Sequence, residues 1–314
     1  MTNANILAID IGGSKILAGI VDDSGNVLGE KKILLDKPDQ ASLLADILSL
    51  CDSFLNNFEM SAIGLSIPGL VDVEKGVWLE AVFSKVRNFP LGNILAEKYR
   101  LPVFLENDAN NSALGEKYFG HAKDRDDFIW LTVSNGCGAG VFLNGKLFTG
   151  SGGHAGELGH IRVTDEDFTC PCGNTGCLEA SAAGPGISRR YKALSGEELS
   201  AKEIAVRARA GDKSAIAVYK KTGEYIGTAI AAAVNVINVP LVVVGGGISM
   251  DYDLFSEDME MTVHKKIYRT ANKDLQIEHT KLGYQASLVG AAANCLYQLQ
   301  SASVECCCVQ EAGK

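Results

Sequence analysis

The sequence predicts an α/β protein built from two domains with similar cores. Its 314 residues are enough for roughly two domains of ordinary size. Apolar strand patterns and helical patterns follow one another along the chain. A strand, a glycine turn and a returning strand occur near Asp10 and again near Asn135, and such a repeat indicates two domains related by duplication.

The chain begins with the pattern of an antiparallel meander. Residues 6–10 form an apolar run before Gly12 and Gly13, and residues 16–21 form a second run. A turn over residues 22–26 precedes a third strand over 27–35. A helix is predicted next, over residues 40–54, because its apolar residues are spaced to form one buried face: Leu43, Leu44, Ile47, Leu48, Cys51 and Phe54.

Two buried strands complete the first half. Residues 62–67 form one, which ends at Pro68 and Gly69. Residues 102–105 form the other, and Glu106-Asn107-Asp108 follows at its carboxyl end before a helix predicted over 109–118.

The second half repeats the plan. A strand over 128–133 leads into a glycine-rich turn over 134–140 and a return strand over 141–143. A long, alanine-rich helix is predicted over 219–239, and an apolar strand over 241–244 runs directly into three glycines. The last helix is predicted over about 286–299, with a frayed tail from Ser301.

These elements divide the chain into two lobes. We expect the N-terminal lobe to comprise residues 1–119 together with about 287–314, so that the last helix closes it. The C-terminal lobe would comprise residues 120–286 and carry a cysteine-rich motif.

Composition excludes several classes of protein. The net charge of −9 argues against non-specific nucleic-acid binding, which requires Lys and Arg to neutralise phosphates. No apolar run reaches the length that spans a membrane, and residues 1–5 lack the basic start and apolar core of a signal peptide. We therefore expect a cytoplasmic protein with neither nucleic acid nor membrane as a partner.

The cysteine-rich motif indicates a metal site. Cys170, Cys172 and Cys177 lie within eight residues, and His160 precedes the first by ten positions. Thiolates and imidazole are the ligands that tetrahedral zinc prefers, and a reducing cytosol disfavours the alternative of disulfide-bonded or merely buried cysteines. Glu157 and Glu179 flank the motif but exceed the four ligands, so we expect them to contact something bound beside the metal.

Three glycine-rich turns suggest phosphate binding. Each follows a buried strand, where backbone N–H groups can line a concavity that no side chain fills. An ordinary structural turn is the alternative reading of each, but three of them fit a nucleotide held between two lobes. The turns are Asp10-Ile11-Gly12-Gly13-Ser14-Lys15, Ser134-Asn135-Gly136-Cys137-Gly138-Ala139-Gly140 and Gly245-Gly246-Gly247.

Asp108 is the candidate catalytic base. It follows a buried strand, where a carboxylate is costly without a purpose or a partner. The structural alternative is that Asp108 is the N-cap of the helix over 109–118, a role that Asp fills well.

These motifs together resemble the ROK family of sugar kinases, within the actin-like, ribonuclease-H-like ATPase superfamily. The resemblance runs from Leu7 to about Tyr297 and implies a two-domain actin-like fold with an interdomain cleft. It is carried by residues 7–15, Ile67-Pro68-Gly69, Glu106-Asn107-Asp108-Ala109-Asn110, Ala155-Gly156-Glu157-Leu158-Gly159-His160 and the block from Cys170 to Glu179.

The resemblance also implies roles for individual residues. ATP, Mg²⁺ and a structural Zn²⁺ would be the bound groups, and the zinc would be held by His160, Cys170, Cys172 and Cys177. The residues that approach the ATP phosphates would be Asp10, Gly12, Gly13, Ser14, Lys15, Ser134, Asn135 and Gly136, with Gly245, Gly246 and Gly247 near the adenosine. The sugar would be surrounded by Gly69, Asn107, Asp108, Glu157, His160 and Glu179, with Asp108 as the base. A homo-oligomer, dimer or tetramer, is expected.

The chain departs from the family pattern in two places. Members that act on glucose usually carry an Asn in a short loop that contacts the sugar, where this chain has Val82-Phe83-Ser84. The phosphate turn usually reads Gly-Thr-Gly, where this chain has Ser134-Asn135-Gly136. An Asn side chain can still donate a hydrogen bond to a phosphate oxygen.

The sequence therefore predicts an ATP- and Mg²⁺-dependent kinase of glucose or a close relative, acting at the 6-hydroxyl. The alternatives are an N-acylhexosamine kinase (for N-acetylmannosamine or N-acetylglucosamine), a fructokinase, and a sugar-binding regulator with weak catalysis. The family also contains transcriptional repressors, which normally carry an N-terminal helix-turn-helix domain of about 60–80 residues. Since this chain starts directly at its first strand, we expect a kinase rather than a repressor.

Overall fold

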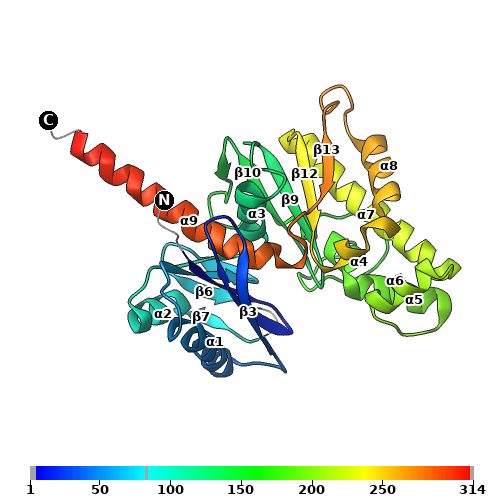
Figure 1. Cartoon of the computed structure of the whole chain (residues 1–314). Helices are drawn as coiled ribbons and strands as arrows, with labels where there is room; N and C mark the ends of the chain where they lie inside the picture. Colours follow the sequence, from blue (N-terminus) through cyan, green and yellow to red (C-terminus); the bar gives the residue numbers. More distant parts are fainter. Residues whose placement is uncertain (1–4, 82–83, 312–314) are drawn as a thin grey trace. The chain divides into compact units, whose positions relative to one another are not determined.

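The computed structural model describes the backbone of residues 5–81 and 84–311, and the side chains as far as Leu299 (Figure 1). The chain forms two compact units. The first comprises Met1–Lys123 and Gln285–Lys314, and the second comprises Asp124–Tyr284. Each unit is built around its own five-stranded sheet.

The sheet of the first unit has the strand order β3-β2-β1-β4-β8. The first three strands form the expected antiparallel meander, and β4 and β8 continue the sheet in parallel. The strands are β1 (Ile6–Ile11), β2 (Lys15–Val21), β3 (Val27–Leu34), β4 (Ala62–Ile67) and β8 (Val103–Asn107).

Helices cover both faces of this sheet, because alternate strand residues point to opposite sides. On one face, Leu7 and Ile9 pack with α1 (Gln40–Leu55). On the other, Ile6 and Ala8 pack with α9 (Ala286–Glu311). The expectation that the last helix ends near Leu299 with a frayed tail is wrong, because α9 continues to Glu311.

Two glycines let α9 lie unusually close to its neighbours. A Cβ on Gly64 of β4 would lie 2.3 Å from the carbonyl oxygen of Ala291 in α9. A Cβ on Gly290 would lie 1.9 Å from the carbonyl oxygen of Asn111 in α3 (Asp108–Phe119). Since neither backbone oxygen can move without shifting its element, the first contact fixes the height of α9 above the sheet and the second fixes its distance from α3.

The first unit also contains small elements that the sequence analysis did not predict. They are a three-stranded sheet of β5 (Leu70–Asp72), β6 (Val77–Glu80) and β7 (Arg87–Phe89), and the short helix α2 (Leu91–Tyr99).

The sheet of the second unit has the order β11-β10-β9-β12-β13, with β12 parallel to both β9 and β13. Its β10 begins at Cys137, so the turn after β9 is confined to Ser134–Gly136 and the expected turn over 134–140 is too long. The strands are β9 (Phe128–Val133), β10 (Cys137–Leu143), β11 (Lys146–Leu147), β12 (Leu241–Gly245) and β13 (Gln276–His279).

The long helix α7 (Lys213–Ile237) dominates the core of the second unit. It begins earlier than expected, because Asp212 caps it by accepting hydrogen bonds from Ser214 and Ala215. It ends at Asn238, whose φ of 60° is left-handed. The other helices are α4 (Leu178–Ala182), α5 (Gly184–Ser195), α6 (Ala201–Arg209) and α8 (Ser256–Lys266), and the 3₁₀ helices are η1 (Leu158–His160), η2 (Gly247–Leu254) and, across the unit boundary, η3 (Gly283–Gln285).

No helix in the described part of the chain combines the length and the apolar character needed to cross a membrane.

Candidate active site

Two glycine turns lie side by side in the second unit. The turn Ser134–Gly136 follows β9 and the turn Gly245–Gly247 follows β12, and these neighbouring strands are parallel with Gly245 opposite Thr132. A Cβ on Gly247 would lie 3.1 Å from the Ser134 hydroxyl. The structure therefore brings together two of the three turns that the sequence analysis assigned to the nucleotide.

Gly246 is a position in these turns that requires glycine. Its φ is 91°, in the left-handed region. A Cβ there would lie 2.5 Å from the carbonyl oxygen of Val133 and 2.6 Å from the Thr132 hydroxyl. The turn after β12 thus lies directly against the end of β9.

Glu179 joins the turn after β9 to the cysteine motif. It lies in the first turn of α4, and one carboxylate oxygen accepts a hydrogen bond from the backbone N–H of Cys137 at 3.1 Å. The other carboxylate oxygen lies 3.9 Å from the Cys170 sulfur. A Cβ on Gly136 would lie 2.7 Å from Glu179, so the carboxylate occupies the space beside the turn.

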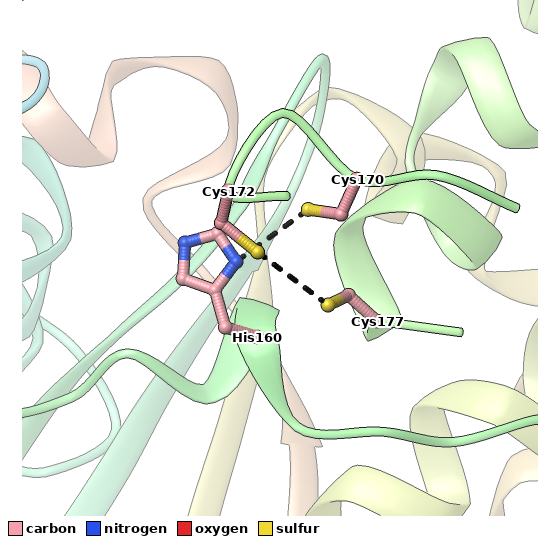
Figure 2. A group of neighbouring side chains, drawn as sticks. All are labelled: His160, Cys170, Cys172 and Cys177. Atoms are coloured by element: carbon pink, nitrogen blue, oxygen red, sulfur yellow. Dashed lines mark hydrogen bonds between the residues drawn. The ribbon is translucent and has the colours of Figure 1, made fainter. Parts of the chain in front are cut away.

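His160, Cys170, Cys172 and Cys177 form a compact cluster (Figure 2). Their donor atoms all lie within 4.8 Å of one another. The Cys170 sulfur is 3.6 Å from His160 Nδ1, and the sulfurs of Cys172 and Cys177 are 3.8 Å apart. The loop that carries the cysteines folds back through left-handed glycines, and Gly176 leaves no room for a Cβ beside the Thr164 carbonyl.

This donor set fits zinc. A tetrahedral site with Zn–S of about 2.3 Å and Zn–N of about 2.0 Å separates two sulfurs by about 3.8 Å and a sulfur from a nitrogen by about 3.5 Å. Burial raises the pKa of the Cys170 thiol to about 12, whereas the backbone hydrogen bond from Asn174 lowers the pKa of the exposed Cys172 thiol to about 7. A cation would be required to hold the buried Cys170 as a thiolate.

The imidazole of His160 faces two ways. Nδ1 points to the cysteines, while Nε2 lies 3.5 Å from a carboxylate oxygen of Glu157. A metal bound at Nδ1 would fix the ring and leave Nε2 directed at Glu157. His160 belongs to the cluster, and Glu157 and Glu179 contact it, so the structure brings these three predicted sugar-binding residues together in the second unit.

In the first unit, the corner between β8 and α3 presents Asp108. The N-cap of α3 is Asn107, whose side-chain oxygen accepts hydrogen bonds from Ala109 at 2.9 Å and Asn110 at 3.3 Å. The alternative interpretation, in which Asp108 is the N-cap of this helix, is therefore wrong. Asp108 is the first residue of the helix, half-buried, and one of its carboxylate oxygens accepts from the same Ala109 N–H at 2.9 Å.

Gly69 lies next to this corner. The amide nitrogen of Asn107 donates a hydrogen bond to the Gly69 carbonyl at 3.2 Å. Gly69 has a φ of 85°, and a Cβ there would lie 2.3 Å from the Glu80 carbonyl oxygen. The structure thus brings Gly69, Asn107 and Asp108 together, as predicted for three residues of one site.

The corner depends on Glu106, a residue to which the sequence analysis assigned no role. Glu106 is 4% exposed, and one of its carboxylate oxygens accepts hydrogen bonds from the Asn107 N–H at 2.8 Å and the Asn110 side chain at 3.0 Å. A charged residue at the end of an otherwise apolar strand is the signal that could have identified it.

The third glycine turn lies between β1 and β2 of the first unit. It is a tight hairpin in which the Gly12 N–H donates to the Lys15 carbonyl at 2.9 Å, and Gly13 and Ser14 are exposed at its tip. Asp10 precedes it and accepts a hydrogen bond from the Ser287 hydroxyl at 2.8 Å. Burial raises the pKa of Asp10, while Ser287 and Lys15 lower it in part.

Two further features concern the altered loop and a cavity. Val82 and Phe83, which replace the family's Asn, are outside the described residues, while Ser84 is buried and its hydroxyl has no partner among those described. A cavity of about 300 Å³ lies between α7 and α8, but none of the predicted site residues lines it.

Comparisons with known proteins agree with the motifs. Residues 6–297 match the model of the ROK family. The glucokinase of Thermotoga maritima is 32% identical over 93% of this chain and 98% of its own length. The xylose repressor of Caldicellulosiruptor bescii is also 32% identical, over 92% of this chain and 77% of its own length.

A solved structure shows the same relationship in three dimensions. The ROK family glucokinase from Streptomyces griseus, in complex with glucose and AMPPNP, superposes with a TM-score of 0.82 at 29% identity, over 92% of this chain and 98% of that one. The predicted fold class, an α/β two-domain actin-like fold, is confirmed.

Proposed function

The chain belongs to the ROK family, and on this premise we propose that it is an ATP- and Mg²⁺-dependent hexose kinase. The family contains both sugar kinases and repressors among the relatives of this chain, so membership alone does not assign an activity. The proposal rests on how the chain arranges its own residues.

The observation that supports the kinase proposal most directly is that Glu179 makes two contacts. One oxygen of this carboxylate accepts a hydrogen bond from the backbone N–H of Cys137, directly after the turn Ser134–Gly136. The other lies beside Cys170, in the cluster of His160 and three cysteines. The group proposed to bind phosphate and the group proposed to bind sugar therefore adjoin one another within the second unit. Phosphoryl transfer requires this adjacency, since donor and acceptor must be held in line.

In the proposed reaction, Asp108 accepts the proton of the sugar hydroxyl as that oxygen attacks the γ-phosphoryl group, and the bond from the γ-phosphorus to the β–γ bridging oxygen breaks to release ADP. Asn107 caps α3 and ties the corner to Gly69, which fixes where Asp108 points. Glu157, His160 and Glu179 would bind ring hydroxyls.

Backbone groups of the glycine turns would bind the ATP phosphates, and Asp10 would orient the water shell of Mg²⁺. Bound Mg²⁺ neutralises charge on the phosphate oxygens. Zinc at the His160 cluster would be structural, since its four ligands leave no open position.

We propose glucose or a close relative as the sugar, phosphorylated at the 6-hydroxyl. The names of two relatives support glucose. N-acylhexosamines and fructose remain the alternatives, because Val82 and Phe83 stand where glucose-specific members carry an Asn. Asn135 in the turn Ser134–Gly136 favours a second candidate, a sugar-binding regulator with little catalysis.

The test is an ADP-release assay with glucose, mannose, fructose, allose, N-acetylglucosamine and N-acetylmannosamine, run in parallel with calorimetric sugar binding. A kinase should release ADP with at least one of these sugars. If the 6-hydroxyl of glucose is the acceptor, no ADP should be released with 6-deoxyglucose. Tight binding of a sugar without ADP release would instead identify the regulator. Tight, exclusive phosphorylation of glucose would show that the altered loop does not affect specificity.

A further inference from the structure

Packing against α9 brings three polar side chains together in the first unit. In the parallel pairing of β1 with β4, Asp10 lies opposite Ser66 and Ala8 lies opposite Gly64. Gly64 is a point of close approach between the sheet and α9, at Ala291. Residues two apart on a strand share a face, so Ser66 and Asp10 face α9 as Gly64 and Ala8 do.

The helix supplies the third side chain. Residues four apart on a helix share a face, so Ser287 lies one turn before Ala291 on the side that meets the sheet. The contact at Gly64 therefore places Ser287 above Ser66 and Asp10. The Ser287 hydroxyl is hydrogen-bonded to the Ser66 hydroxyl and donates to the Asp10 carboxylate at 2.8 Å.

The direction of these hydrogen bonds follows from the number of protons. A serine hydroxyl has one proton, and an ionised carboxylate can only accept. Ser287 uses its proton toward Asp10, so the proton between the two serines must come from Ser66. The result is a chain in which Ser66 donates to Ser287 and Ser287 donates to Asp10, and each bond strengthens the next.

We infer that Ser287, supported by Ser66, is a positioning residue that orients the Asp10 carboxylate toward the bound Mg²⁺–nucleotide. The inference rests on the proposed function, in which Asp10 orients the water shell of Mg²⁺. Lys15, in β2 after the turn, also acts on Asp10 by its charge and lowers the pKa of that carboxyl in part. Ser287 is the neutral donor that fixes the carboxylate from the side of α9.

The experiment measures Mg²⁺ affinity by calorimetry, with AMPPNP as the nucleotide so that no turnover occurs. The full-length variants are Ser287→Ala, Ser287→Thr, Ser66→Ala, Asp10→Asn and the double variant Ser287→Ala with Asp10→Asn. Ser53→Ala is the matched control, because Ser53 donates to the Leu50 carbonyl at 2.8 Å within α1 of the same unit. Sugar affinity without nucleotide is measured for every variant as a check of folding.

Ser287→Ala should weaken Mg²⁺ binding about tenfold, the scale of one hydrogen bond to a charged group. Ser66→Ala should weaken it less, Ser287→Thr should restore most of it, and Ser53→Ala should not change it. In the Asp10→Asn background the loss of Ser287 should add less than about twofold, because residues that act through one another are not additive.

Three outcomes would overturn the positioning role, and they differ in what they mean for the proposed function. If Asp10→Asn weakens Mg²⁺ binding but Ser287→Ala does not, or if Ser287→Ala weakens it equally in both backgrounds, the positioning role is refuted and the kinase proposal stands. If Asp10→Asn leaves Mg²⁺ binding unchanged, the role proposed for Asp10 fails, and the positioning role that depends on it fails too.

Discussion

At the scale of single residues, the corner between β8 and α3 assigns helix capping and the proposed proton acceptance to two different side chains. Asn107 caps the helix, and Asp108 follows it as the first helical residue. The carboxylate of Asp108 can therefore be changed without removing the cap. This separation makes the catalytic proposal testable on a folded protein.

We predict that Asp108→Asn lowers turnover by about 10²- to 10⁴-fold, the usual loss when a general base is removed. The amide has nearly the size of the carboxylate but cannot accept the sugar proton. Sugar affinity should change far less, and the free energy of unfolding should change by less than about 1 kcal/mol, because Asn107 remains as the cap. Turnover, calorimetric sugar binding and melting temperature are measured on one preparation.

Asn107→Ala is the complementary variant. It removes two hydrogen bonds to the first turn of α3 and the bond to Gly69, and should therefore lower the free energy of unfolding by about 1–2 kcal/mol. If Asp108→Asn turns over sugar at a near-normal rate, Asp108 is not the base. If Asp108→Asn lowers the melting temperature as much as Asn107→Ala does, the role of Asp108 is structural.

The sequence was a better guide to some site residues than to others. His160 and the three cysteines were found because they fall close together along the chain. Ser287 could not be related to Asp10 in this way, because their contact depends on the register of β1 with β4 and on the height of α9. A contact between residues so distant in sequence can be recognised only once the packing of the elements is known.

At the scale of elements, we expect the loop that carries the cysteines to depend on its proposed metal. The loop has few apolar contacts, since Cys170, Cys177 and Ala180 form only a small buried cluster with Phe168. A bound cation would be the main cross-link between the loop and His160.

We predict one zinc per chain in protein purified without added metal, measured by elemental analysis. Removing it with a chelator, or replacing Cys172 with Ser, should lower the melting temperature and the sugar affinity together, because His160 and Glu179 border the same cluster. Native alkylation provides the control, since Cys51 and Cys295 are fully buried and should not react in either state. Metal-free protein whose motif cysteines all react freely would rule out the zinc site.

The close packing of α9 yields a second prediction at this scale. Gly64→Ala should destabilise the first unit by about 1–3 kcal/mol, the usual range for overpacking, because its Cβ would press on the Ala291 backbone. Gly29→Ala is the matched control: Gly29 lies in β3 of the same sheet and its Cβ would meet nothing within 4 Å. Denaturant unfolding compares them, and equal stability of the two variants would contradict the packing argument.

Most long elements could be predicted and several short ones could not. The strands β4 and β9 were located at their observed bounds, because each is an apolar run with a turn signal after it. The start of β10 at Cys137 was missed because Gly138 and Gly140 look like turn residues, although they lie within the strand. The strands β5 to β7 contain three or four residues each, too few to show a period.

At the scale of the whole molecule, the two units share a plan. Each has an antiparallel hairpin at one side of its sheet and parallel strands at the other: β1–β2 with β4 in the first, and β9–β10 with β12 in the second. The repeated strand, glycine turn and strand in the sequence predicted this similarity. It did not predict the small sheet β5–β7, which only the first unit has among the described residues.

The first unit is built from two separate segments of the chain and the second from one, and this difference affects the order in which they can fold during synthesis. The second unit is one continuous segment, Asp124–Tyr284, whereas the first needs α9 to cover the face of its sheet that carries Ile6 and Ala8. On the ribosome, the second unit can fold as soon as its last strand emerges, but the first must wait with that apolar face exposed. Nascent chains stalled so that residue 284 has emerged while α9 is still inside the ribosome should therefore show protease resistance in the second unit and none in the first. Resistance of both units would show that the first sheet closes without α9.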